Sequence, residues 1–342
     1  MIKKIMFGAL IIIILICAGS GLFLYSKVNK NINEHFAGTC TNFNMSGSGE
    51  DIQIDREYGL AYVSLFDRQA LANKEPVEPG DILVIDLNQT PLKANSALID
   101  GPSLRPHGLS LFIDPIGQRH LFVINHPENR KTGKEKIERY IEKNPGEFQH
   151  QETFMSPMIS RANDLVAVSE RQFYVAQDVD RSSGEKLTGL VYFNGKDYSE
   201  VATDIQSGGG INTSQDYKTL YISETGGKTI RVVSRNLSTG KISTLQNIDL
   251  GTSPDNINVA EDGSLWIGAH SNILALVMHF IMGSNAPSQI LRIDLSGKEP
   301  EIREIYLNSG QQISASSGGT TYGGKLLIGS ITAKKLLICE ME

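Results

Sequence analysis

Three pairs of neighbouring acidic and amide residues stand out in this chain as groups that could bind a metal ion. They are Glu50-Asp51, Asn163-Asp164 and Asp255-Asn256, and each pair opens a stretch that reads as strand, turn, strand. His107 and Asn212 open two further stretches of the same kind. If these stretches are arranged radially, the side chains converge on one axis. Carboxylate and amide oxygens that meet there form a cage suited to a hard cation such as calcium.

The stretches that contain these residues form a repeat. Their positions are 51, 107, 163, 210, 255 and 318, and each combines alternating apolar residues, a turn rich in Gly, Asp or Lys, and a second β-branched or aromatic run. This is the pattern of a β-hairpin. Units spaced by about 45 to 63 residues are typical of a β-propeller, whose blades recur every ~40–50 residues. We therefore predict an all-β, six-bladed propeller over residues 31–342, with a β-sandwich or barrel as the alternative.

The composition agrees with one large all-β domain and restricts its partners. The 342 residues include 33 Gly and 12 Pro, and 40% of them are hydrophobic, which is enough for one sizeable core. The net charge of −6 argues against nucleic acid as a partner, because nucleic acid requires a basic surface. The charged stretch Arg130 to Glu147 is predicted to be a short helix or a solvated loop.

An almost unbroken apolar run extends from Ile5 to Tyr25, with lysines on both sides. Its length matches the ~20 residues with which a helix crosses a bilayer and exceeds the ~7–15 residues of a signal-peptide core. We predict that residues 1–30 are an uncleaved signal anchor and linker, which would place a membrane-anchored propeller on the extracytoplasmic side, either periplasmic or extracellular. A cleaved signal peptide, which would release a secreted domain, is the alternative.

Two cysteines, Cys40 and Cys339, lie at opposite ends of the predicted propeller. A propeller closes its ring by pairing the first strand of the chain with the last blade, so a disulfide between these ends would lock the closure. Such a bond also fits an oxidising, exported location. Two unrelated buried thiols are the alternative.

The order and spacing of several motifs resemble the serum paraoxonase/arylesterase family of six-bladed, calcium-dependent propellers. The resemblance extends from about Cys40 to Cys339, and its motifs are SGSGEDIQI, RPHGLSLF, LFVINHP, NDLVAV, GINTS, DNINV, LWIGAH, GGKLLIGS and a terminal ICE. An N-terminal anchor and an end-to-end disulfide are also traits of this family. The resemblance implies hydrolysis of lactones and aryl esters, with lactones as the natural class of small-molecule substrate.

The resemblance also implies two calcium ions and divides the oxygen ligands between them. The catalytic ion at the bottom of the pocket would be held by Glu50, Asn163, Asp255 and Asn256. The structural ion, deeper in the channel, would be held by Asp51, Asp164 and the backbone carbonyl of Leu109. Because neighbouring residues of a strand point to opposite faces, one acid or amide pair can serve two ions.

A pair of histidines that activates water is a further implication of the resemblance, and the matching residues are His107 and His126. A histidine with a pKa near ~6.5 can accept a proton from water at neutral pH. A bound calcium can polarise the ester carbonyl and stabilise the oxyanion that forms. His270 matches another pocket histidine, and we expect it to contact the substrate or the leaving group.

One departure separates this chain from the family pattern. The residue directly before the GIN tripeptide is an Asn ligand in the family, whereas here it is Gly209, which has no side-chain oxygen. Asn212 follows three residues later, where strand alternation points it the other way. The departure leaves open a membrane-anchored calcium-binding propeller that binds a ligand or protein partner without catalysis. An enzyme for another small substrate, such as a sugar lactone, is a third hypothesis.

The apolar run Ile273 to Met282 follows His270 and is too short to span a membrane. In the family, a loop over the active site occupies this position. We predict either a lid that lines an apolar pocket for acyl chains or a surface that contacts the bilayer. Ordinary core packing is the alternative.

Overall fold

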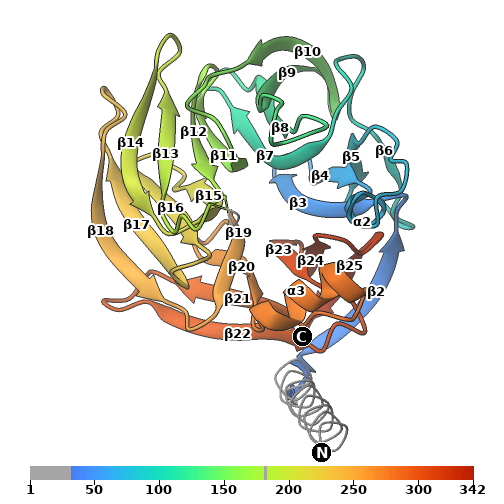
Figure 1. Ribbon diagram of the computed structural model, residues 1–342. Coiled ribbons are helices and arrows are strands. Elements are labelled where there is room, and N and C mark those ends of the chain that lie inside the picture. The colour runs from blue at the N-terminus through green and yellow to red at the C-terminus, as the bar shows by residue number, and fades with distance from the viewer. Residues whose placement is uncertain (1–31, 181–182) are drawn as a thin grey trace, which may run out of the picture.

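The computed structural model describes residues 32–180 and 183–342, which form six β-sheets arranged as the blades of a ring (Figure 1). Each of the first four blades is a four-stranded antiparallel sheet with its strands in chain order from the inner to the outer edge. The first two blades consist of β3 (Ser48–Asp55), β4 (Leu60–Phe66), β5 (Asp81–Asp86) and β6 (Ala94–Ser96), and of β7 (Pro106–Ile113), β8 (Arg119–Asn125), β9 (Lys136–Asn144) and β10 (Glu147–Phe154). The next two consist of β11 (Ala162–Ser169), β12 (Gln172–Gln177), β13 (Thr188–Phe193) and β14 (Tyr198–Ile205), and of β15 (Gly208–Thr213), β16 (Thr219–Glu224), β17 (Thr229–Arg235) and β18 (Ile242–Asp249). The predicted six-bladed propeller is confirmed.

The last two blades receive their outer strands from the beginning of the described chain. The fifth contains β19 (Ser253–Val259), β20 (Leu265–His270), β21 (Ser288–Asp294) and β22 (Glu301–Asn308), with β1 (His35–Phe36) added at its outer edge. The sixth contains β23 (Ser316–Tyr322), β24 (Lys325–Ser330) and β25 (Lys335–Met341), and β2 (Gly38–Asn44) completes it. The ring is therefore closed by pairing the two ends of the propeller.

A disulfide joins the two closing strands. Cys40 of β2 lies directly opposite Cys339 of β25 in the strand register, and the two sulfur atoms are bonded. The bond connects residues that are 299 positions apart in the sequence. The predicted disulfide is confirmed, and it joins the first and last strands of the sixth blade, which come from opposite ends of the propeller.

Removal of this disulfide is expected to destabilise the protein. A variant with Cys40→Ser and Cys339→Ser should lose about 2–5 kcal/mol of unfolding free energy, because the open chain gains conformational entropy when it unfolds. Chemical denaturation under non-reducing conditions measures the loss, and the wild-type protein with and without reductant is the control. An unchanged denaturation midpoint would show that strand pairing alone closes the ring.

The second strand of each blade lies between two neighbouring blades and is therefore buried on both faces. All seven residues of β4 and all seven of β8 are buried, which explains why both strands have consecutive apolar residues at their centres. Aromatic rings fill the space between the second and third blades, where Phe173 contacts Phe122 and Phe154 at centroid distances of 5.8 and 5.3 Å. These layers make the inner strands a rigid support for the channel.

The prediction for the charged stretch Arg130 to Glu147 is wrong over most of its length, because Lys136–Asn144 forms β9. Ile137 and Tyr140 of this strand are completely buried. Glu138 is buried as well, and its carboxylate accepts hydrogen bonds from Asn125 and Thr153 and lies 3.0 Å from Nε2 of His150. The charges that suggested solvent exposure are thus paired inside the blade.

No helix in the described part of the chain is long and apolar enough to cross a membrane. The predicted anchor at residues 1–30 lies outside the described residues, so its prediction is unchanged. Two short helices are described: α2 (Arg68–Ala72) follows the second strand of the first blade, and α3 (Ile273–Met282) follows that of the fifth. Helix α3 lies over the last two blades on the face of the ring that Figure 1 presents to the viewer.

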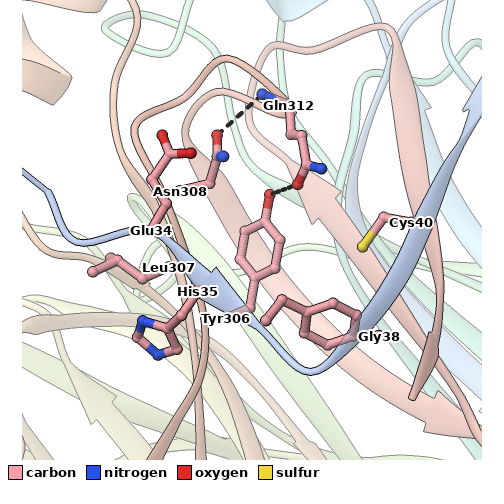
Figure 2. A pocket seen from close by; sticks show the side chains of 9 residues that line it. Glu34, His35, Gly38, Cys40, Tyr306, Leu307, Asn308 and Gln312 are labelled. Atoms are coloured by element: carbon pink, nitrogen blue, oxygen red, sulfur yellow. Dashed lines mark hydrogen bonds between the residues drawn. The ribbon is translucent and has the colours of Figure 1, made fainter. Parts of the chain in front are cut away.

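A groove of about 310 Å³ lies at the outer rim, where β1 and β2 cross the edges of the last two blades (Figure 2). Its polar groups already bond to one another. The hydroxyl of Tyr306 donates to Oε1 of Gln312 at 2.9 Å, and the backbone N–H of Gln312 donates to Oδ1 of Asn308 at 3.0 Å. We therefore place the candidate site in the central channel and not in this larger groove.

Candidate active site

The inner strand of each of the six blades has a β-bulge at the same place. The pairing with the second strand is interrupted between Gly49 and Ile52, Pro106 and Leu109, Ala162 and Asp164, Gly208 and Ile211, Pro254 and Ile257, and Ser316 and Gly319. The skipped residues are Glu50-Asp51, His107-Gly108, Asn163, Gly209-Gly210, Asp255-Asn256 and Ser317-Gly318. A bulge releases residues from the ladder and re-aims their side chains. Five of the six acid and amide residues of the three pairs are therefore bulge positions at the channel, and the sixth, Asp164, directly follows the bulge of its strand.

Glycines allow the inner strands to approach one another closely around the channel. A Cβ atom on Gly108 would lie 2.4 Å from Oδ1 of Asp164, and one on Gly210 would lie 2.6 Å from the backbone oxygen of Asp255. Neither position has room for a side chain, which is the usual reason for glycine where two backbones meet.

A pocket of about 170 Å³ opens near the bulges. Its polar wall consists of Glu50, His107, Asn163, Asp178, Thr225, Asp255 and His270, and its apolar wall consists of Ile273, Leu276, Phe280 and Ile331. Buried polar groups on one side and apolar side chains on the other are the usual composition of a small-molecule site. Of the ten residues predicted for the site, five line this one cavity: Glu50, His107, Asn163, Asp255 and His270.

Helix α3 provides most of the apolar wall. The side chain of Asn272 caps its first turn by accepting a hydrogen bond from the N–H of Ala275, and Gly283 ends it with a φ of 68°, a conformation that glycine adopts without strain. Leu276 is buried, whereas Ile281 and Met282 are 70% and 69% exposed. The run therefore covers the pocket with one face and leaves the other free, so core packing alone does not describe it.

Three buried oxygen atoms at or beside the pocket have no hydrogen-bond partner. They are Oε2 of Glu50, Oδ1 of Asn163 and Oδ1 of Asn256. The amide nitrogen of Asn256 donates to Oε1 of Glu50 at 2.8 Å, which leaves the other Glu50 oxygen and the Asn256 oxygen free. Buried polar atoms without partners are rare and call for an explanation such as an ion. Oxygens from three different blades fit a calcium ion, which takes its ligands from carboxylates and amides.

Among residues 32–180 and 183–342, no three His, Cys, Asp or Glu side chains form a cluster that could hold a metal ion by themselves. The predicted ligand set differs from such a cluster because two of its members, Asn163 and Asn256, would bind through amide oxygens. The donor set is hard oxygen from both acids and amides, the chemistry that calcium prefers over softer nitrogen or sulfur sites.

Burial has a strong effect on the ionisation of the acidic residues here. It raises the pKa of Glu50 to about 8, and the neighbouring charge of Asp255 adds to the rise. The buried guanidinium of Arg68 acts in the opposite direction; it donates to the hydroxyl of Ser48 and to the backbone oxygen of Pro106. One buried cation does not offset several buried carboxylates, and a bound cation would lower their pKa values.

Asp51 and Asp164 connect neighbouring blades through hydrogen bonds from the backbone. The carboxylate of Asp51 accepts from the N–H groups of Ile52 and Leu109, both at 2.7 Å. The carboxylate of Asp164 accepts from those of Leu165 and Ile211, both at 2.8 Å. Burial nevertheless raises the pKa of Asp51 to about 6. Leu109 thus meets Asp51 through its N–H, and the role predicted for its carbonyl as a ligand stays a prediction.

His107 and His126 contact each other with ring centroids 4.8 Å apart. Nε2 of His107 lies 3.7 Å from Oε2 of Glu50. Nδ1 of His126 lies 2.6 Å from Oε2 of Glu135, whose other oxygen accepts a hydrogen bond from Arg130 at 2.9 Å. Burial first, and nearby positive charge second, lower the pKa of both histidines well below the ordinary 6.5. Both rings are therefore neutral at pH 7 and able to accept a proton.

His270 lies on the opposite side of the pocket from the histidine pair. Its Nε2 is 3.0 Å from Oδ2 of Asp255, and its Nδ1 is buried without a hydrogen-bond partner. The side chain is 5% exposed. His270 therefore orients a predicted metal ligand and lines the cavity at the same time.

Sequence reasoning missed three pocket residues, Asp178, Thr225 and Ile331, which share a place in the repeat with the predicted His126 and His270. In five blades, take the last residue of the inner strand before the bulge and its partner on the second strand. The residue that follows this partner lies at or beside the pocket. These residues are His126, Asp178, Thr225, His270 and Ile331. Alignment of the second strands would have revealed Asp178 and Thr225. Arg68 and Glu135 lie outside the repeat, and no sequence pattern identifies them.

The fold and the pocket define the class of this protein: a six-bladed β-propeller with a polar candidate active site in its central channel. Solved structures agree with the fold. The allergen Mala s 1 of Malassezia sympodialis matches with a TM-score of 0.57 and 13% identity over 89% of this chain and 96% of that chain. At this identity the similarity concerns the fold alone.

The chain belongs to the arylesterase (paraoxonase) family, whose family model, described as "Arylesterase", matches residues 48–341. It is 31% identical over 312 residues to human serum paraoxonase/arylesterase 1, covering 85% of both chains. It is 29% identical over 314 residues to human serum paraoxonase/lactonase 3, covering 86% of both chains. The predicted family is confirmed, and with it the enzyme class of carboxylic-ester hydrolase.

Proposed function

We propose that the protein hydrolyses lactones and aryl esters in a reaction that depends on calcium and on the pair His107 and His126. The observation that supports this most directly is that unpartnered oxygens of Glu50 and Asn163 line one pocket with His107, and that Asn256, with a third unpartnered oxygen, bonds to Glu50. The names of the relatives include both arylesterase and lactonase, and the apolar wall favours substrates with an acyl chain or an aromatic ring.

In this proposal Glu50, Asn163, Asp255 and Asn256 hold the catalytic calcium. Asp51 and Asp164 have lone pairs beyond their backbone bonds and hold a second, structural ion together with the carbonyl of Leu109. When bound, the catalytic calcium polarises the ester carbonyl and lowers the energy of negative charge on its oxygen.

The histidine pair accepts the proton that the attacking water releases. His107 lines the pocket and, as a neutral imidazole, accepts the proton when water attacks the carbonyl. His126 lies behind it, with Nδ1 held by the carboxylate of Glu135, so its buried Nε2 is free to receive the proton in turn. The negative charge of Glu135 stabilises the imidazolium that results. Arg130 holds Glu135 in place.

The location is also a proposal. We propose that residues 1–30 anchor the propeller on the extracytoplasmic side of a membrane, or are removed to release a secreted domain. The disulfide between Cys40 and Cys339 supports this, since such bonds persist in oxidising compartments. The exposed apolar face of α3 is compatible with contact to a lipid surface.

The test is hydrolysis by the purified full-length protein of a long-chain lactone, a short-chain lactone and phenyl acetate. Turnover is expected with calcium, is expected to vanish with excess chelator, and should return when calcium is restored. Loss of turnover with chelator in a protein that remains folded identifies a metal-dependent step. Turnover that persists in chelator would contradict the calcium mechanism.

Gly209 supports a second candidate function, because it removes one side chain from the inner wall of the pocket. A propeller that binds calcium and a ligand or protein partner without turnover would fit that loss. A folded protein that binds calcium and hydrolyses none of the three substrates would favour this candidate.

A further inference from the structure

The fourth blade presents no inner-strand side chain to the pocket, because its bulge consists of Gly209 and Gly210. A Cβ atom on Gly209 would lie 2.5 Å from Oγ1 of Thr225 and 3.3 Å from the backbone oxygen of Pro254. The space that a side chain at 209 would need is therefore occupied by the hydroxyl of Thr225. The side chain missing at Gly209 is therefore replaced in space by the hydroxyl oxygen of Thr225.

Thr225 directly follows β16 and occupies the place in its blade that His126, Asp178 and His270 occupy in theirs. It lines the same pocket as Glu50, Asn163 and Asp255. Its hydroxyl donates to the backbone oxygen of Pro254 at 2.8 Å. Because this bond uses the only hydroxyl proton, the oxygen keeps lone pairs with which it can accept or bind a cation.

The distance of this oxygen from the Cβ position of residue 209 is that of an amide oxygen on an Asn side chain. Ordinary bond lengths place the oxygen of an Asn side chain roughly 2.4 Å from its Cβ. Oγ1 of Thr225 lies 2.5 Å from the Cβ position of residue 209. We propose that Thr225 supplies the oxygen of the fourth blade to the catalytic calcium, in place of a side chain at 209. This inference rests on the calcium site of the proposed function and adds a ligand to it.

Calcium binding to full-length protein, measured by isothermal titration calorimetry, tests the proposal. Thr225→Val has nearly the same shape without the oxygen and is expected to weaken calcium binding by about 10- to 100-fold, as losses around metal sites commonly do. Thr225→Ser keeps the hydroxyl and should bind within about threefold of the wild type. Thr213→Val is a matched control, since Thr213 lies in the same blade and its hydroxyl donates to a backbone oxygen of Thr219 at 3.0 Å.

A second experiment restores an amide side chain at position 209 and removes the hydroxyl at position 225. Gly209→Asn alone should bind calcium poorly, because its side chain meets the hydroxyl of Thr225. Gly209→Asn combined with Thr225→Ala should recover binding, because the amide oxygen then has room. The rise in melting temperature on adding calcium provides a second measure that does not depend on activity.

The outcomes separate this inference from the function on which it rests. Wild-type affinity in a folded Thr225→Val variant, with calcium binding intact in the wild type, would overturn the role of Thr225 alone. Absence of calcium binding in the wild type would overturn both the calcium site and the inference. Weak binding in Thr225→Val with normal binding in Thr225→Ser and Thr213→Val supports both.

Discussion

His107→Gln is expected to lower kcat for a lactone by about 10²- to 10⁴-fold, the usual contribution of a general base. His107 is the histidine of the pair that lines the pocket, and its ring is neutral at pH 7 because burial lowers its pKa. Gln has a similar length and polarity but cannot accept the proton of the attacking water. Initial rates at saturating substrate, with the melting temperature measured in parallel, test this expectation.

Two further variants show whether the loss of kcat in His107→Gln comes from the histidine pair. His126→Gln is expected to have a smaller effect than His107→Gln, since His126 lies behind His107 and acts through it. His35→Gln serves as a matched control, because His35 lies on the outer rim with its side chain 42% exposed. Wild-type rates in both the His107 and His126 variants would remove the pair from the mechanism, and the metal site would then have to activate water without them.

Removal of calcium is expected to lower the melting temperature by roughly 5–10 °C at pH 8 and much less at pH 5. Calcium at about a hundredfold excess over its Kd adds about 2.7 kcal/mol to the free energy of unfolding. In domains of ~150–250 residues, each kcal/mol shifts the melting temperature by about 2–4 °C, which gives the value at pH 8. Thermal unfolding with calcium and with chelator, at both pH values, measures the two shifts.

The sign of this pH dependence follows from the raised pKa values. The pKa of Glu50 rises from 4.5 to about 8 and that of Asp51 from 3.8 to about 6 when the protein folds without metal. Between the unfolded and folded values the folded protein binds more protons, so its stability falls as the pH rises through this window. Calcium removes that loss because it binds the deprotonated carboxylates, and it binds weakly at pH 5, where protons compete.

Glu50→Gln separates the effect of charge from that of shape. The variant keeps the volume of the side chain and one acceptor oxygen, replaces the other oxygen with an amide donor, and cannot ionise. We expect its metal-free form to be more stable than the metal-free wild type at pH 8, and its calcium affinity to be lower. A chelator that leaves the wild-type melting temperature unchanged at pH 8 would show that the buried carboxylates are stable without a cation.

The repeat could be predicted from the sequence because its cause is local. Each inner hairpin has its own alternation of apolar residues and its own turn, so the six units appear in the chain without knowledge of their neighbours. The end-to-end disulfide could also be predicted, since ring closure brings Cys40 and Cys339 together in any propeller of this order. The stretch around β9 could not, because the charges of Glu138 and its neighbours are paired by residues from other strands.

The sequence by itself determined the six hairpins, the oxygen-bearing pairs that open three of them, the histidines of two motifs and the apolar run that became α3. Only the tertiary structure decided which of these atoms meet. Bulges at equivalent positions turn Glu50 and Asn163 toward one pocket, where Asn256 bonds to Glu50, and the ends of second strands bring Asp178 and Thr225 beside them. The physical reason is that alternation and turn chemistry act over a few residues, whereas a pocket is built from contacts between blades that are distant in the sequence.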